Sequence, residues 1–117
     1  MDTLHDVMKA IVAFRDERDW AQFHTPRNLA AALAIEAAEL QETMLWKPDR
    51  EVELLLTDTK KREELQQELG DVLIFALLLA HGCGIDPLQA IHQKLAINAV
   101  KYPIEKARGV ATKYTDL

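Results

Sequence analysis

Apolar residues recur at steps of three and four residues through most of the chain, which is the pattern of amphipathic α-helices. Near the N-terminus these positions are Leu4, Val7, Met8, Ile11 and Phe14. They predict a first helix over about residues 3–20, and Thr3 with an acidic residue three positions later resembles a capping pair. The N-terminal part of the chain is therefore predicted to be an amphipathic α-helix.

Cap and breaker residues divide the rest of the chain into three further long helices. Thr25-Pro26 and Asp86-Pro87 each combine an N-cap residue with a proline at the first helical position. They predict helices over residues 25–46 and 86–101. Another helix is expected from residue 58 or 59 to about residue 81. In the segment before it, residues 49–59, EVELLL fits a short helix and TDT fits a turn and helix cap. The closing segment, residues 104–117, has little apolar periodicity, so we expect it to be ordered only against a partner subunit.

The helix expected over residues 59–81 contains nine consecutive apolar residues, 72–80. A helix that is apolar on every side is normally buried on every side. Four helices in a chain of 117 residues can hardly cover it. We therefore expect a single domain, residues 1–117, that forms an all-α four-helix bundle completed by homo-oligomerisation, as a homodimer or a dimer of dimers.

Two acidic pairs stand on the apolar faces of the predicted helices. Glu36 and Glu39 form one pair, and Glu68 and Asp71 form the other. Residues three positions apart point within about 60° of each other on a helix, so each pair projects from one side. Glu36 shares that side with leucines and alanines, whereas a solvated glutamate normally lies opposite the apolar stripe. Carboxylates on such a face are costly to desolvate unless a cation meets them.

These four carboxylates predict a metal site. Oxygen ligands without cysteine or histidine suit a hard cation, Mg²⁺ or in its place Mn²⁺. The plain alternative is that acidic pairs at this spacing are solvated. We expect Glu42 and Glu64 either to be solvated or to support the metal ligands without touching the metal. A di-iron bundle is disfavoured, because no histidine has a glutamate three residues before it.

Other candidate residues suit a ligand with phosphates and an aromatic base. Lys94, Asn98 and Tyr102 recur at steps of four and would form one polar stripe. Trp20 and Trp46 flank the second helix, and Phe75 lies one turn beyond the second acidic pair. His24 precedes the second helix. The plain alternatives are a wet helix face for the stripe, core packing for the tryptophans and a local structural role for the histidine.

The composition of the chain limits the classes of molecule that it is expected to bind. The net charge of −5 argues against a nucleic-acid backbone as partner but permits a nucleotide held through metal ions. The single cysteine, Cys83, cannot form an internal disulfide. The N-terminal pattern is not that of a signal peptide, and the longest apolar run is far below the ~20 residues of a membrane span. We therefore expect a soluble cytoplasmic protein. Its sequence shows neither a nucleophile–base arrangement nor a glycine-rich phosphate loop.

Three blocks of the chain resemble one family of enzymes. They are RDWAQFHTPRNLAAALAIEAAELQETMLWK, EELQQELGDVLIFALLLA and KLAINAVKYPIEKARGVATKYTDL. In this order they are similar to the all-α nucleotide pyrophosphohydrolases of the MazG-like superfamily, and most of all to its small dCTP-pyrophosphatase branch. The resemblance implies Mg²⁺-dependent hydrolysis of a nucleoside triphosphate to the monophosphate and pyrophosphate, in the service of nucleotide-pool house-cleaning.

The resemblance also assigns roles to residues. It implies that the metal-binding and catalytic acids are Glu36, Glu39, Glu68 and Asp71. It implies that the tryptophans contact the base and that the lysine, asparagine and tyrosine of the polar stripe bind substrate. Ile11 and Phe75 stand where the dCTP-specific relatives are expected to have polar or tyrosine contacts, which leaves the base preference open. A dUTP or phosphoribosyl-ATP substrate, or a non-catalytic metal-binding interaction module, are the alternatives.

Overall fold

The computed structural model describes residues 2–117, and within this range the chain is helical and contains no strand. The described residues form six α-helices and two short 3₁₀ turns. The helices form two compact units, one ending at Gly84 and the other spanning residues 85–117. The all-α prediction is therefore confirmed.

Helix α1, Leu4–Glu17, starts at the predicted place. The Thr3 hydroxyl accepts a hydrogen bond from the Asp6 backbone N–H, and the Asp6 carboxylate accepts one from the Thr3 N–H, both at 3.1 Å. The helix ends three residues earlier than predicted. Asp19 takes a left-handed conformation (φ 55°), which an α-helix cannot continue through. The 3₁₀ turn η1, Ala21–Phe23, follows.

Helix α2, Pro26–Glu42, begins as predicted, with the Thr25 side chain accepting from the Asn28 N–H at 3.2 Å. It does not reach residue 46. Pro48 disfavours helical geometry in the residue before it, and Trp46 is left-handed with φ 62°. The chain therefore leaves α2 through a turn over residues 43–46.

The segment between the two acidic pairs contains helix α3, Asp49–Leu55, so the short helix expected from EVELLL is confirmed. Helix α4, Thr59–Gly82, follows at once. Its N-cap is Asp58, whose carboxylate accepts from the Lys61 N–H at 3.1 Å. After the helix, Gly84 adopts φ 66°, a left-handed geometry that glycine takes without strain.

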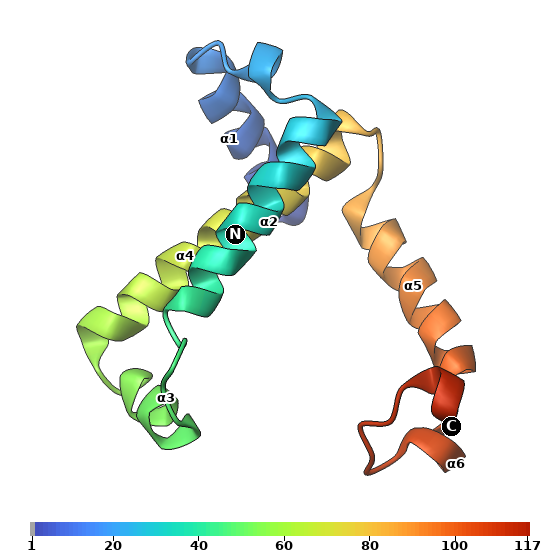
Figure 1. Ribbon diagram of the computed structural model, residues 1–117. Helices are drawn as coiled ribbons and strands as arrows, with labels where there is room; N and C mark the ends of the chain where they lie inside the picture. Colours follow the sequence, from blue (N-terminus) through green and yellow to red (C-terminus); the bar gives the residue numbers. More distant parts are fainter. Residues whose placement is uncertain (1) are drawn as a thin grey trace. The chain divides into compact units, whose positions relative to one another are not determined.

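Helices α2 and α4 lie side by side and antiparallel, joined through α3, as Figure 1 shows, and α1 packs against α4. The core sits where the start of α2 meets the end of α4. Leu29 is 2% exposed and Leu78 is 4% exposed, and the Leu29 side chain lies 3.6 Å from the place that a Cβ on Gly82 would occupy. This packing fixes the register in which Glu36 and Glu39 of α2 face Glu68 of α4.

The apolar part of α4 is only partly covered within the chain. Leu69, Leu73 and Ile74 keep 45%, 54% and 39% of their surface exposed. Burial on every side, which the sequence predicts for this helix, is thus not achieved by a single copy. Homo-oligomerisation stays a prediction that this exposed surface supports.

The second unit consists of helix α5, Pro87–Lys101, helix α6, Ile104–Ala107, and the 3₁₀ turn η2, Tyr114–Asp116. The Asp86 carboxylate caps α5, as predicted, by accepting from two backbone N–H groups at 2.9 and 3.2 Å. The closing segment thus contains two short helical turns that its weak apolar periodicity did not predict, and its ordering against a partner subunit stays a prediction. The Tyr114 ring packs edge-on against Tyr102 at 5.9 Å, and the Lys101 ammonium lies 4.7 Å from the Tyr114 ring centre.

Within residues 2–117, no single helix is both long and apolar enough to cross a membrane. Helices α4 and α5 meet the length and composition criteria only when they are counted together as a bent pair.

Candidate active site

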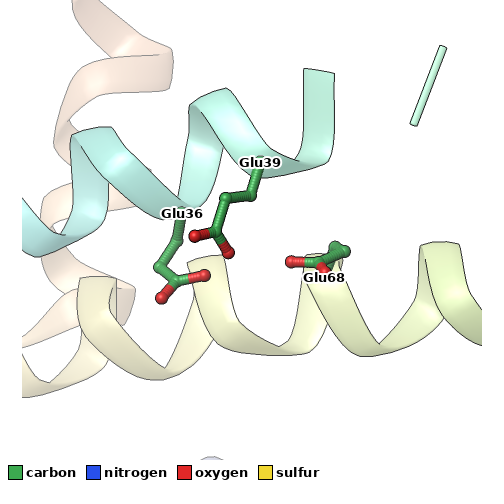
Figure 2. Close-up of side chains that lie close together, drawn as sticks. All are labelled: Glu36, Glu39 and Glu68. Atoms are coloured by element: carbon green, nitrogen blue, oxygen red, sulfur yellow. The ribbon is translucent and has the colours of Figure 1, made fainter. Parts of the chain in front are cut away.

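Three carboxylates converge between α2 and α4. Glu36 and Glu39 project from α2 toward α4, and Glu68 projects from α4 toward them, as Figure 2 shows. Each side chain offers an oxygen, and the three oxygens lie within 4.8 Å of one another. This arrangement follows from the three-residue spacing on α2 and from the antiparallel pairing of the two helices. It brings together three of the four acids that the sequence predicts as metal ligands.

Two of these carboxylates have a buried oxygen without a partner. Among the described residues, Glu36 Oε2 and Glu68 Oε2 are buried and accept no hydrogen bond. A buried acceptor without a partner costs roughly 1–3 kcal/mol, and more when it is charged. Glu39 is exposed and closes the group on the solvent side. The cluster is thus short of positive charge and of hydrogen-bond donors.

The pKa values of these carboxyl groups reflect their burial and their closeness to one another. Burial, together with a hydrogen bond to Glu39 and the neighbouring carboxylates, raises the pKa of Glu36 from 4.5 to about 7. Burial also raises the pKa of Glu68, with further contributions from the charges of Glu39 and Asp71. In the absence of a cation, Glu36 therefore keeps its proton at pH values where an ordinary glutamate is charged.

These observations fit a divalent ion. All the donors are carboxylate oxygens, they are spaced to share one ion, and two of them have no partner within the described chain. Hard oxygen donors favour Mg²⁺, Mn²⁺ or Ca²⁺ over softer metals. A clustering of acids suited to a metal is thus confirmed, and the identity of the metal stays a prediction.

Asp71, the fourth predicted acid, lies one turn along α4 from Glu68 and outside the close group of three oxygens. Its charge still contributes to the raised pKa of both Glu36 and Glu68. Its side chain is exposed and lines the pocket described next. Asp71 therefore connects the carboxylate cluster to that pocket.

The pocket has a volume of about 620 Å³ and lies within the first unit. Its walls come from one face of α1, from the segment that joins α1 to α2, and from α4. The lining residues are Asp2, Asp6, Val7, Ala10, Ile11, Phe14, Arg15, Trp20, His24, Asp71, Ile74, Phe75 and Leu78. Pockets for small molecules usually measure about 300–1,000 Å³ and are largely apolar, as this one is.

Aromatic rings form a continuous series along this pocket. Phe14 meets Trp20 edge-on with ring centres 5.9 Å apart, and the His24 ring lies 6.4 Å from Trp20. The same imidazole lies 6.4 Å from the ring of Phe75. Three of the predicted substrate-contacting residues, Trp20, His24 and Phe75, thus line the pocket together.

Trp46 lies elsewhere. It is 92% exposed, has a left-handed backbone and does not line the pocket. Conversely, Phe14 was expected only as part of the apolar face of the first helix, whereas it lines the pocket together with Ile11, which the resemblance had already placed at a contact position. Their periodicity identified the face correctly. It could not show that part of this face borders a cavity, because only the packing of α1 on α4 decides that.

The predicted polar stripe lies in the second unit. Lys94 and Asn98 occupy successive turns of α5, with Lys94 exposed. Tyr102 follows the end of the helix, is 39% exposed and packs against Tyr114, so the stripe does not continue onto it as a regular helical position. The role of these three residues toward a ligand stays a prediction.

An all-α fold in which two antiparallel helices hold a group of carboxylates beside an apolar pocket defines a class of helical proteins with an acidic site suited to a metal ion. The chain matches the MazG-like family over residues 31–117, which is more than half of its length. It therefore belongs to the MazG-like family.

Two curated relatives and one solved structure extend this result. The chain is 46% identical over 115 residues to dCTP pyrophosphatase 1 of Mus musculus and 45% identical to that of Bos taurus. Each match covers 98% of this chain and 68% of the relative. The crystal structure of a pyrophosphatase from Archaeoglobus fulgidus superimposes with a TM-score of 0.78 at 35% identity, covering 88% of this chain and 94% of that one. The resemblance drawn from the sequence blocks is confirmed.

Proposed function

We propose that this protein is a Mg²⁺-dependent nucleoside triphosphate pyrophosphohydrolase. Its substrates are deoxynucleoside triphosphates, namely dCTP or related and non-canonical dNTPs, and its products are the nucleoside monophosphate and pyrophosphate. The observation that carries this proposal is the group of three carboxylates with two buried, unpaired oxygens. The dCTP pyrophosphatases among the relatives support the reaction class.

The electrostatics of the site suit such a substrate. A triphosphate is strongly negative and cannot approach a group of carboxylates unless divalent cations lie between them. A bound Mg²⁺ supplies charge neutralisation at the phosphates and lowers the pKa of a coordinated water. In this proposal Glu36, Glu39, Glu68 and Asp71 hold the metal, and one of the glutamates orients the attacking water or accepts its proton.

The reaction balances without any further reactant. The oxygen of water forms a bond to phosphorus, and the bridging P–O bond between the α and β phosphates breaks. One proton leaves the attacking water, and the departing pyrophosphate oxygen takes the electron pair of the broken bond; a cation held by the acids would neutralise the charge that develops there. Attack at the α-phosphorus leaves the water oxygen in the monophosphate, whereas attack at the β-phosphorus leaves it in pyrophosphate.

The pocket next to the cluster receives the nucleoside. Asp71 belongs both to the lining of the pocket and to the electrostatic surroundings of the carboxylates, so phosphates at the cluster leave the base within reach of the pocket. Trp20, His24 and Phe75 contact the base there. Lys94, in the second unit, stays in the proposal as a phosphate-binding residue on the family resemblance alone. Asn98, Tyr102 and Trp46 complete the substrate contacts that we propose.

A second copy of the chain completes the molecule in this proposal. The exposed leucines of α4 and the 92% exposed Trp46 are surface that a homodimer, or a dimer of dimers, would cover. A cytoplasmic location remains a prediction.

The proposal is tested by incubating the protein with Mg²⁺ and a panel of canonical and modified dNTPs, dUTP and phosphoribosyl-ATP included, and separating the products by chromatography. Monophosphate and pyrophosphate in equal amounts are expected. The controls are a chelated sample and the Glu39→Gln variant, which keeps the side-chain shape and removes the charge. Diphosphate and phosphate as products would contradict the proposed reaction. A folded protein that binds Mg²⁺ without turning over any nucleotide would instead support the interaction-module alternative.

A further inference from the structure

The segment that joins α1 to α2, residues 18–25, carries two residues of the pocket wall. Trp20 and His24 both line the pocket, and the His24 ring lies 6.4 Å from the Phe75 ring of α4, centre to centre. The segment itself is not buried, since Trp20 keeps 43% and Phe23 keeps 60% of its surface exposed. Burial in the core therefore contributes little to fixing the path of this segment.

Hydrogen bonds from side chains to the backbone hold the segment instead. At its start Asp19 has a left-handed backbone, and the Gln22 amide donates to the carbonyl oxygen and to Oδ2 of Asp19, at 3.1 and 3.0 Å. At its end Nδ2 of Asn28 donates to the Phe23 carbonyl oxygen at 3.0 Å. Asn28 lies in the first turn of α2, so this second bond ties the segment to a regular helix.

The hydrogen bond from Asn28 acts on the peptide group next to His24. The Phe23 carbonyl belongs to the planar peptide that links Phe23 to His24, so its orientation also sets the direction in which the His24 side chain leaves the backbone. Within the described chain, Nδ1 of His24 is buried and has no hydrogen-bond partner. A buried nitrogen without a partner is costly and gives the ring no restraint of its own. The restraint comes from Asn28, outside the pocket.

The Asn28 side chain is not needed for α2 itself. The bond that caps this helix start runs from the Asn28 backbone N–H to the Thr25 hydroxyl at 3.2 Å, and any residue other than proline can make it. Aspartate in the first turn of a helix is favoured by the helix dipole, and alanine has a higher helix propensity than asparagine. Replacing Asn28 by either residue therefore removes the bond to Phe23 without weakening the helix.

We propose that Asn28 is a positioning residue of the substrate pocket, acting through the peptide between Phe23 and His24. It fixes the place of the His24 ring between Trp20 and Phe75, and thereby the wall that a bound nucleotide meets. Asn28 itself does not line the pocket. This inference rests on the proposed function and adds to it a residue that substrate binding needs without contact to the substrate.

The experiment measures kcat, KM and Tm for the wild type, Asn28→Asp and Asn28→Ala, at saturating Mg²⁺ and with the best nucleotide substrate of the wild type. Both variants lose the amide donor, and only the first changes the charge. We expect KM to rise by about 2–12-fold in both, which is the effect of one hydrogen bond, with kcat within about twofold of wild type. The Tm should stay the same or rise.

Thr25→Ala is the matched control at the same helix start. It removes the cap of α2 and leaves the Asn28 amide in place. Loss of an N-cap destabilises a helix, so the Tm should fall, while KM stays within about twofold of wild type. The control and the Asn28 variants are thus expected to show opposite patterns in Tm and KM.

Three results would overturn the inference and leave the proposed function standing. The first is a wild-type KM in both Asn28 variants. The second is a higher KM in Asn28→Asp alone, which charge would explain. The third is an equal rise of KM in Thr25→Ala, which would mean that KM follows the stability of the helix start. A wild-type protein that turns over no nucleotide would instead overturn the proposed function, and the inference with it.

Discussion

Metal binding by the carboxylate cluster should depend steeply on pH, and Glu36 is the reason. Its pKa is raised to about 7, first of all by burial, whereas an ordinary glutamate has a pKa of 4.5. A carboxyl group with a raised pKa contributes stability that is fully present below about pH 4.5 and is lost as the pH rises through about 7. The metal-free protein should therefore lose thermal stability across this range. Metal binding, which needs the charged carboxylate, should become stronger as the pH approaches 7.

The size of the effect follows from the pKa. A group with a pKa of about 7 is about 9% ionised at pH 6 and about 91% ionised at pH 8, so one proton linked to binding changes the apparent Kd about tenfold. The pKa of Glu68 is also raised, which acts in the same direction. At pH 6, binding of one Mg²⁺ should release nearly one proton from Glu36.

Calorimetric titration with Mg²⁺ at pH 6, 7 and 8, in two buffers that differ in ionisation enthalpy, measures both the Kd and the number of protons released. Glu36→Gln is the control variant. It should bind Mg²⁺ more weakly at pH 8 and release fewer protons at pH 6 than the wild type does. If the Kd of the wild-type protein at pH 6 stayed within twofold of its value at pH 8, the proton-linked account of this cluster would be wrong.

Further predictions concern the acids, the core and the assembly. Glu39→Gln and Asp71→Asn should each abolish hydrolysis while circular dichroism shows the same helix content, and turnover in either variant would count against the ligand assignment. Leu29→Ala removes a side chain that is 2% exposed, and it should lower the free energy of unfolding by about 2–5 kcal/mol in a urea titration. Gly70→Ala should raise that free energy by about 1 kcal/mol, because a Cβ there meets nothing within 4 Å. Light scattering should give a mass of two or four chains, and Leu73→Glu, on the exposed face of α4, should lower it; a monomeric wild type would contradict the predicted assembly.

The sequence placed the starts of the helices accurately, because a helix start depends on contacts within three residues. Thr25 caps α2 and Asp86 caps α5 as their Thr-Pro and Asp-Pro pairs predict. Helix ends were less predictable. The turn after Glu42 includes the left-handed backbone of Trp46, and the closing segment packs through Tyr114 against Tyr102. Neither feature leaves a periodic signal in the chain.

For the site, the sequence by itself determined that Glu36, Glu39 and Glu68 stand on the inner faces of two helices, since spacing along one helix fixes the side on which a residue lies. Only the tertiary structure decided which oxygens meet. The antiparallel register of α2 and α4 places Glu39 in the group with Glu36 and Glu68 and leaves Asp71 at the edge of the pocket. The packing of α1 on α4 likewise turned an apolar helix face into the wall of a cavity, because a cavity depends on the distance between elements, which no single helix encodes.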